Sequence, residues 1–162
     1  MIRPLDPIID REAVAGVMAQ AADYFRLWLG RPAGEAEVDD FLTGGPPDTD
    51  PATAQRLGLF VDGHLSGLAE MTLGFPGPGD AYLGLMILSP HIRGQGHGRA
   101  FLAHIEATAR ASGAPMLYLA VLAANPLGRA FWEREGFAAT GFSREDDSHG
   151  MGHTVYRLAK PL

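Results

Sequence analysis

The feature that most constrains this chain is a glycine-rich turn between an apolar strand and a helix. The apolar segment at residues 81–88 runs into a proline and then into Arg-Gly-Gln-Gly-His-Gly at residues 93–98, and an amphipathic helix follows. A glycine turn that opens a helix directs several free backbone N–H groups at one point, where the positive end of the helix dipole adds to their attraction for anions. The sequence therefore predicts a phosphate-binding site at this turn.

Two common phosphate-binding motifs are excluded by their spacing. Counted from Gly94, the third glycine of a dinucleotide fingerprint would fall at Arg99. A P-loop needs a Gly-Lys pair before Ser or Thr, and the only lysine of the chain is Lys160. The pattern that remains is Arg-x-x-Gly-x-Gly, from Arg93 to Gly98.

A second block of the sequence carries another strand-and-helix signal. The apolar run Met116–Leu122 predicts a buried strand. After it, Asn125 is a good helix N-cap, Pro126 suits the first helical position, and Gly136 suits the residue just past the helix end. The sequence therefore predicts a short helix between Asn125 and Gly136.

Together the two blocks resemble the GNAT N-acetyltransferase superfamily. The Arg93–Gly98 turn is similar to its acetyl-coenzyme A motif, and Asn125 followed by Trp132-x-x-x-Gly-Phe is similar to its later block. The resemblance implies an α/β (α+β) fold, with a central mixed, mostly antiparallel sheet, flanking helices and a V-shaped cofactor cleft between two central strands. We expect residues 1–162 to form a single domain of this kind.

Hydrophobic periodicity and turn residues predict the other elements. Asp10 is expected to cap the first helix, and residues 144–152 are expected to form a mobile loop. The last strand is expected at the sheet edge, where two copies could pair, so the chain is a monomer or a homodimer. The predicted strands are residues 1–5, 55–61, 65–73, 81–88, 116–122, 138–142 and 153–158. The predicted helices are residues 10–22, 35–42, 100–113 and 126–135.

The composition limits the chemistry. The chain has no cysteine, which excludes disulfides, thiolate metal sites and an acyl-cysteine route. Its net charge of −6 argues against a nucleic-acid-binding surface. His149 and His153 lie in a glycine-rich segment unsuited to a helix, so we expect no metal site. No apolar run is long enough to span a membrane and no targeting signal is visible, so we expect a soluble, cytoplasmic protein without membrane contact.

The resemblance implies a site for acetyl-coenzyme A, which is a cosubstrate. Its pyrophosphate would accept hydrogen bonds from the backbone N–H groups between Gly94 and Arg99, and its pantetheine amides would pair with the backbone of Met86–Leu88. Arginine side chains near the turn could meet its phosphates. The residues expected to bind the cosubstrate are Met86, Ile87, Leu88, Arg93, Gly94, Gln95, Gly96, His97, Gly98, Arg99, Asn125, Gly128, Arg129 and Trp132.

The reaction implied by the resemblance is direct attack of an amine on the thioester, which requires a base to remove the amine's proton. Glu70 is the only carboxylate within strand 65–73 and resembles the general base that many GNAT enzymes carry there. Asp80, at a strand entrance, is the weaker alternative. Asn125 is the second expected catalytic residue, because it could hydrogen-bond the pantetheine or an intervening water while it caps the helix.

The expected acid for the leaving thiolate departs from the common family pattern. Where many members have tyrosine in the late helix, this chain has Trp132, whose indole N–H donates a hydrogen bond but does not protonate a thiolate. Tyr82 and Tyr118 are possible substitutes, and solvent could also supply the proton. Tyr24, Phe25 and Trp28 form an aromatic cluster that could line the acceptor pocket.

Three functions remain open at the level of sequence. The favoured one is an acetyl-coenzyme A-dependent N-acetyltransferase whose acceptor is a small amine, an amino-acid-like compound or a peptide N-terminus. The alternative is a non-catalytic domain that binds or senses acyl-coenzyme A, and the absence of the usual tyrosine is its main support. A partner-binding domain without the cosubstrate is disfavoured, since a bare scaffold would have no need for the Arg93–Gly98 turn.

Overall fold

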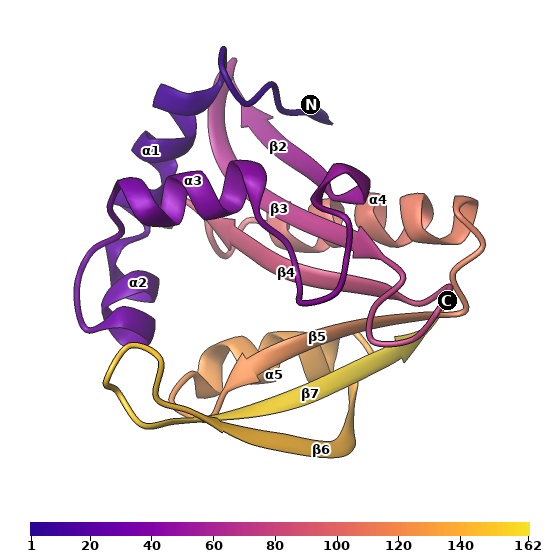
Figure 1. The fold of residues 1–162 in the computed structure, drawn as a ribbon. Coiled ribbons are helices and arrows are strands. Elements are labelled where there is room, and N and C mark those ends of the chain that lie inside the picture. Colours follow the sequence, from indigo (N-terminus) through magenta and orange to yellow (C-terminus); the bar gives the residue numbers. More distant parts are fainter.

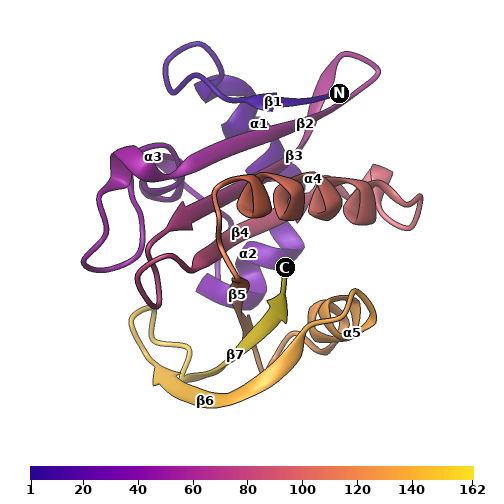
Figure 2. The ribbon, with the colours of Figure 1, turned by 90° about the vertical axis from the view of Figure 1, so that its right-hand side faces the viewer.

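All strands of the protein join into one seven-stranded sheet with the order β1-β2-β3-β4-β5-β7-β6. The computed structural model describes residues 1–162, and Figures 1 and 2 show its arrangement. The strands are β1 (Ile2–Pro4), β2 (Gln55–Val61), β3 (His64–Leu73), β4 (Ala81–Leu88), β5 (Met116–Leu122), β6 (Ala138–Asp146) and β7 (His153–Pro161). The α-helices are α1 (Arg11–Gln20), α2 (Ala22–Leu29), α3 (Glu35–Thr43), α4 (His97–Ala111) and α5 (Pro126–Arg134), and short 3-10 turns lie at Pro51–Thr53 and Pro90–Ile92.

Helices cover both faces of the sheet. Successive residues of the central strands point to opposite sides, so one strand contributes side chains to the packing on both faces. On β3, Leu68 packs with the buried side chains of α1, α2 and α3. Its neighbours Ala69 and Met71 pack instead with Phe101 and the rest of the α4 core. The two hydrophobic cores thus lie on opposite faces, as Figure 1 shows with α1–α3 in front of the sheet and α4 behind it. The predicted fold class is confirmed.

The apolar strands were predicted closely from the sequence. The structure places β2, β4 and β5 at the bounds expected from their apolar runs. The first predicted helix, residues 10–22, corresponds to α1, which ends where the backbone leaves helical geometry at the buried Ala21, and α2 was not among the predicted helices. Helix α4 begins at His97, inside the glycine motif and earlier than predicted. None of the helices combines the length and the apolar character that a membrane crossing needs.

The prediction for the C-terminal region was wrong in two respects. Strand β6 runs on to Asp146, and β7 lies between β5 and β6, so the sheet edge is β6 rather than the last strand. Nearly every β6 residue is exposed, so it lacks the apolar alternation that reveals a strand in a sequence. Pairing with β7 stabilises it, together with hydrogen bonds such as that from Thr154 Oγ1 to Glu145 Oε1, 3.0 Å.

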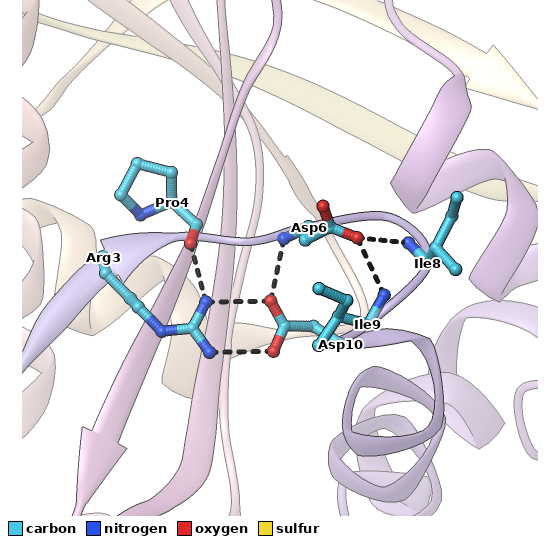
Figure 3. A network of polar contacts seen from close by, with 6 residues as sticks. All are labelled: Arg3, Pro4, Asp6, Ile8, Ile9 and Asp10. Atoms are coloured by element: carbon cyan, nitrogen blue, oxygen red, sulfur yellow. Dashed lines mark hydrogen bonds and ion pairs between the residues drawn. The ribbon is translucent and has the colours of Figure 1, made fainter.

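Asp10 does occupy the N-cap position of the first helix, but the expectation that its side chain caps the helix was wrong. Its backbone is already helical and its carboxylate makes no bond to the first turn of α1. Instead, Arg3 donates to both carboxylate oxygens of Asp10 at 2.8 Å, and the Asp6 N–H donates to one of them at 2.8 Å (Figure 3). This network ties β1 to the start of α1, and the two parallel hydrogen bonds from the Arg3 guanidinium engage both carboxylate oxygens of Asp10.

The Arg3–Asp10 contact predicts a pH-dependent contribution to stability. The guanidinium of Arg3 holds the pKa of Asp10 below its usual range. A depressed pKa means that the contact stabilises the fold above the ordinary carboxyl pKa, about 3.9, and that this stability is lost as the pH falls through the folded-state pKa. We expect Asp10→Asn to lower the melting temperature by a few degrees near pH 7 and by progressively less below pH ~4. Thermal unfolding of both proteins across pH checks this, and a difference independent of pH would contradict it.

Candidate active site

A cleft of about 1390 Å³ passes between the central strands and connects the two faces of the sheet. Its walls come from β4, β5, the glycine turn and the start of α5, and at the other end from α2, α3 and the segment that joins β6 to β7. The cleft lies at the V-shaped opening that was predicted between two central strands. Strands β4 and β5 are parallel neighbours only where Ala81–Leu83 face Leu117–Leu119, and beyond Leu83 their pairing ends.

A β-bulge marks the point where the strands part. Glu70 of β3 pairs with Leu85, whereas the next residue, Met71, pairs with Leu83, which leaves Gly84 as an extra residue on β4. A bulge bends its strand and increases the local twist. Beyond Gly84, the backbone of β4 therefore faces the cleft and makes no strand pairing with β5.

The glycine turn faces the same cleft from the α4 side. Gly94 and Gly96 adopt left-handed backbone conformations, with φ of 73° and 84°, which glycine adopts without strain. No group of the protein accepts a hydrogen bond from the backbone N–H groups of residues 94–99. Gly98 packs closely against the neighbouring side chains, since a Cβ there would lie 3.4 Å from Leu88 Cδ1 and Phe131 Cζ. The turn therefore offers a run of free donors at a helix N-terminus, which is a fit for phosphate.

The structure places most of the predicted cosubstrate residues on the cleft wall and three of them elsewhere. Those on the wall are Met86, Ile87, Leu88, Arg93, Gly94, Gly96, Gly98, Arg99, Asn125, Gly128 and Trp132. Gln95 lines a separate cavity of about 520 Å³ and donates to the His91 carbonyl at 2.8 Å. The side chain of His97 lines neither cavity. Arg129 pairs with Glu133 at 2.8 Å and lies over the ring of Tyr156.

Arg93 lies on the cleft wall but is already engaged. Its guanidinium donates to both carboxylate oxygens of Asp23, at 2.5 and 3.1 Å, and its Nε donates to the Leu88 carbonyl at 3.0 Å. The pairing holds the pKa of Asp23 below its usual range. Arg93 thus joins the glycine turn to α2, on the other wall of the cleft, and was expected to contact phosphate instead.

Glu70 is buried at the junction of β3 and the bulge. Its side chain is 8% exposed, and its carboxylate lies beside Gly84, where a Cβ would be 3.4 Å from either oxygen. Thr72 Oγ1 donates to Oε1 at 3.0 Å, and no donor of the protein reaches Oε2. Burial raises the pKa of Glu70, and Asp40 raises it further, against opposing contributions from Thr72 and Arg56. A carboxylate with a raised pKa beside a cleft is suited to accept a proton.

Asn125 has the capping role predicted for it. Its Oδ1 accepts a hydrogen bond from the Gly128 N–H at 2.9 Å, at the start of α5. A Cβ at position 128 would collide with the Asn125 side chain, which explains the glycine. Asn125 also lies on the cleft wall, so its amide is available to a ligand.

Two tyrosines line the cleft and a third does not. Tyr24 of α2 and Tyr82 of β4 are on the wall, whereas Tyr118 is outside it. Burial, and then the neighbouring Tyr82, raise the pKa of Tyr24 to about 12, and burial also raises the pKa of Tyr82. Both hydroxyls therefore stay protonated near neutral pH. Trp132 packs edge-on against Phe131 and Phe137, with ring centroids 4.9 and 5.5 Å away.

The wall opposite the glycine turn contains residues that the sequence analysis did not single out. Asp40 and Phe41 of α3 lie there with the expected Tyr24 and Trp28 of α2. His149 packs edge-on against Trp28, with ring centroids 5.4 Å apart. No motif links these positions, because they come from segments that only the fold brings together. Nowhere do three or more His, Cys, Asp or Glu side chains form a group that could hold a metal ion.

Comparison with known proteins agrees with this geometry. The model of the acetyltransferase (GNAT) family matches residues 18–137. An acetyltransferase from Thermus thermophilus superposes with a TM-score of 0.79 at 26% identity, over 100% of this chain and 96% of the other. The ribosomal-protein-S18-alanine N-acetyltransferase of Escherichia coli gives 0.74 at 21% identity, over 100% and 93%. The PaiA N-acetyltransferase of Thermoplasma acidophilum, solved with coenzyme A, gives 0.69 at 18%, over 100% and 98%. No curated protein sequence is detectably similar.

Proposed function

Because the chain belongs to the acetyltransferase (GNAT) family, we propose that it transfers an acetyl group from acetyl-coenzyme A directly to a primary amine. The observation that carries the proposal is the cleft where β4 and β5 part, with Gly94, Gly96, Gly98 and Arg99 of the turn on its wall and their N–H groups free. The complex of the PaiA relative with coenzyme A supports the choice of cosubstrate.

The residues of the turn and of β4 would hold the cosubstrate. The N–H groups of residues 94–99 would donate to its pyrophosphate, where the N-terminus of α4 also favours negative charge. The backbone of Met86–Leu88 would pair with its pantetheine amides, except at the Leu88 carbonyl, which already accepts from Arg93. When bound, acetyl-coenzyme A supplies the thioester carbonyl that an amine attacks.

Glu70 would remove the proton of the acceptor amine. An amine with a pKa of ~10.4 is only about one part in a thousand neutral near pH 7.4, which corresponds to ~4 kcal/mol. The buried Glu70 carboxylate has a free oxygen and lines the cleft, so it can accept this proton directly or through a water. Burial raises its pKa, which makes the ionised Glu70 a better base than an ordinary carboxylate.

The leaving thiolate would be met by hydroxyl donors rather than by the late helix. Trp132 packs between Phe131 and Phe137 and offers only an indole N–H. Tyr82 lies on the cleft wall, on the strand that carries the bulge. Its hydroxyl is therefore the protein group that we propose as the proton donor. A thiolate is a good leaving group, so solvent can also supply this proton.

The second candidate is a domain that binds acyl-coenzyme A without turnover, which Trp132 favours because it replaces the usual acid. An assay of thiol release with acetyl-coenzyme A and a panel of primary amines separates the two. We expect amine-dependent release, with the acetylated amine identified by mass spectrometry. Release without acetylated amine would contradict the transferase, and no release with any amine while the cosubstrate still binds would favour the binding domain.

A further inference from the structure

The acceptor end of the cleft carries unbalanced negative charge. Most charged residues on the cleft wall are paired: Asp23 with Arg93, Glu37 with Arg31, and Asp146 with Arg144. Arg99 and Arg134 both lie within 4.0 Å of Glu135. Only Asp40 and Glu70 line the cleft without an ion pair, and both are acidic.

Asp40 and Glu70 face the same space from different elements. Glu70 is on β3, and Asp40 is near the end of α3, which covers that face of the sheet (Figure 1). The two charges are close enough for Asp40 to raise the pKa of Glu70. Arg56, the one cation that acts on Glu70, is not on the cleft wall, and its guanidinium donates to the Phe41 and Gly44 carbonyls at 2.5 and 2.6 Å.

Aromatic rings complete this end of the cleft. Tyr24 and Trp28 stand on one wall, with ring centroids 6.2 Å apart, and Tyr82 stands on another. The faces of such rings attract ammonium groups. On this side the segment that joins β6 to β7 contacts α2, since His149 packs on Trp28 and His153 Nε2 lies 2.8 Å from the Trp28 carbonyl. Acidic and aromatic walls together suit a small cation.

From this arrangement we infer that the acceptor is a small amine with a second positive charge, held by Asp40 while its reacting amine lies at Glu70. The inference rests on the proposed function and specifies its substrate class. If Glu70 takes the proton of the reacting amine, the charge of Asp40 remains to be balanced by another group of the substrate. A carboxylate at that position of the acceptor would instead be repelled by Asp40.

Matched acceptors of the same length test the inference. We would compare 1,4-diaminobutane, butylamine and 4-aminobutyrate by kcat/KM at a single pH. We expect the diamine to exceed butylamine by about five- to tenfold, with 4-aminobutyrate the poorest. In the Asp40→Asn variant this preference should be lost, so that the kcat/KM values for the diamine and for butylamine become equal. Equal values for diamine and monoamine in the unaltered protein, or a preference that persists in Asp40→Asn, would overturn the inference.

Asp39→Asn is the matched control. Asp39 precedes Asp40 on α3, is also exposed, but pairs with Arg11 at 2.6 Å and does not line the cleft. The same substitution there should leave the diamine preference intact. If no amine is acetylated, the proposed function fails, and calorimetry decides the inference separately. Binding of 1,4-diaminobutane to the coenzyme A-saturated protein that Asp40→Asn abolishes would uphold the acceptor class, and absence of binding would overturn it.

Discussion

Gly96→Glu should abolish stabilisation of the protein by coenzyme A. The substitution places a carboxylate among the free N–H groups of the turn, where it would occupy and repel the pyrophosphate site. A ligand at one hundred times its dissociation constant stabilises a protein by ~2.7 kcal/mol, which raises the melting temperature of a chain of this size by about 5–10 °C. We expect this shift in the unaltered protein and none in Gly96→Glu.

Gly113→Glu is a close control for Gly96→Glu. The two glycines flank opposite ends of α4, with φ of 83° and 84° and open space where a Cβ would be. Both substitutions therefore impose similar backbone strain and the same charge, but only Gly96 lines the cleft. Gly113→Glu should retain the full thermal shift. Equal shifts in the two variants would show that the pyrophosphate does not bind at this turn.

Glu70→Gln should lower kcat by about 10²–10⁴-fold, the range expected for loss of a general base. The affinity for coenzyme A should be unchanged, because Glu70 lies on the face of α3 and the glycine turn on the face of α4. Glu106→Gln is a suitable control, since Glu106 is similarly buried, at 7% exposure, but pairs with Lys160 outside the cleft. A comparable loss of kcat in both variants would point to general damage rather than to a base.

The pH dependence gives the Glu70 assignment a sign. Glu70 must be ionised to accept a proton, and burial raises its pKa, so activity should rise with pH through this raised value. At a pH near the pKa of the amine, the free amine no longer needs a base. The difference between the unaltered protein and Glu70→Gln should therefore be largest between the two pKa values and shrink above them. A rate ratio that is constant across pH would remove Glu70 from the proton transfer.

The sequence predicted the parts of the site that depend on local chemistry. Glycines at 94 and 96 adopt the left-handed conformations that the turn requires, and Asn125 caps α5. The strands β4 and β5 have continuous apolar runs, and their bounds follow from those runs. Each of these features needs only neighbouring residues, so a pattern along the chain was enough to find it.

The remaining parts depend on contacts between distant segments. Arg93 was expected at phosphate, but Asp23, seventy residues away along the chain, takes its guanidinium. Asp10 lies at the helix end where it was expected, but its carboxylate pairs with Arg3 of β1 instead of capping the helix. Asp40 belongs to no motif, and only the packing of α3 on the sheet brings it close enough to act on Glu70. Long-range pairing of charged side chains decides these positions, and it leaves no period or spacing in the sequence.

A calorimetric titration of acetyl-coenzyme A into the unaltered protein tests the central claim most directly, because it requires no knowledge of the acceptor. The claim is that the opening between β4 and β5 and the free N–H groups of the turn form one cosubstrate site. We predict binding of one acetyl-coenzyme A per chain with a dissociation constant in the micromolar range. No detectable heat, together with no thermal stabilisation, would contradict the claim and leave the fold without the function proposed for it.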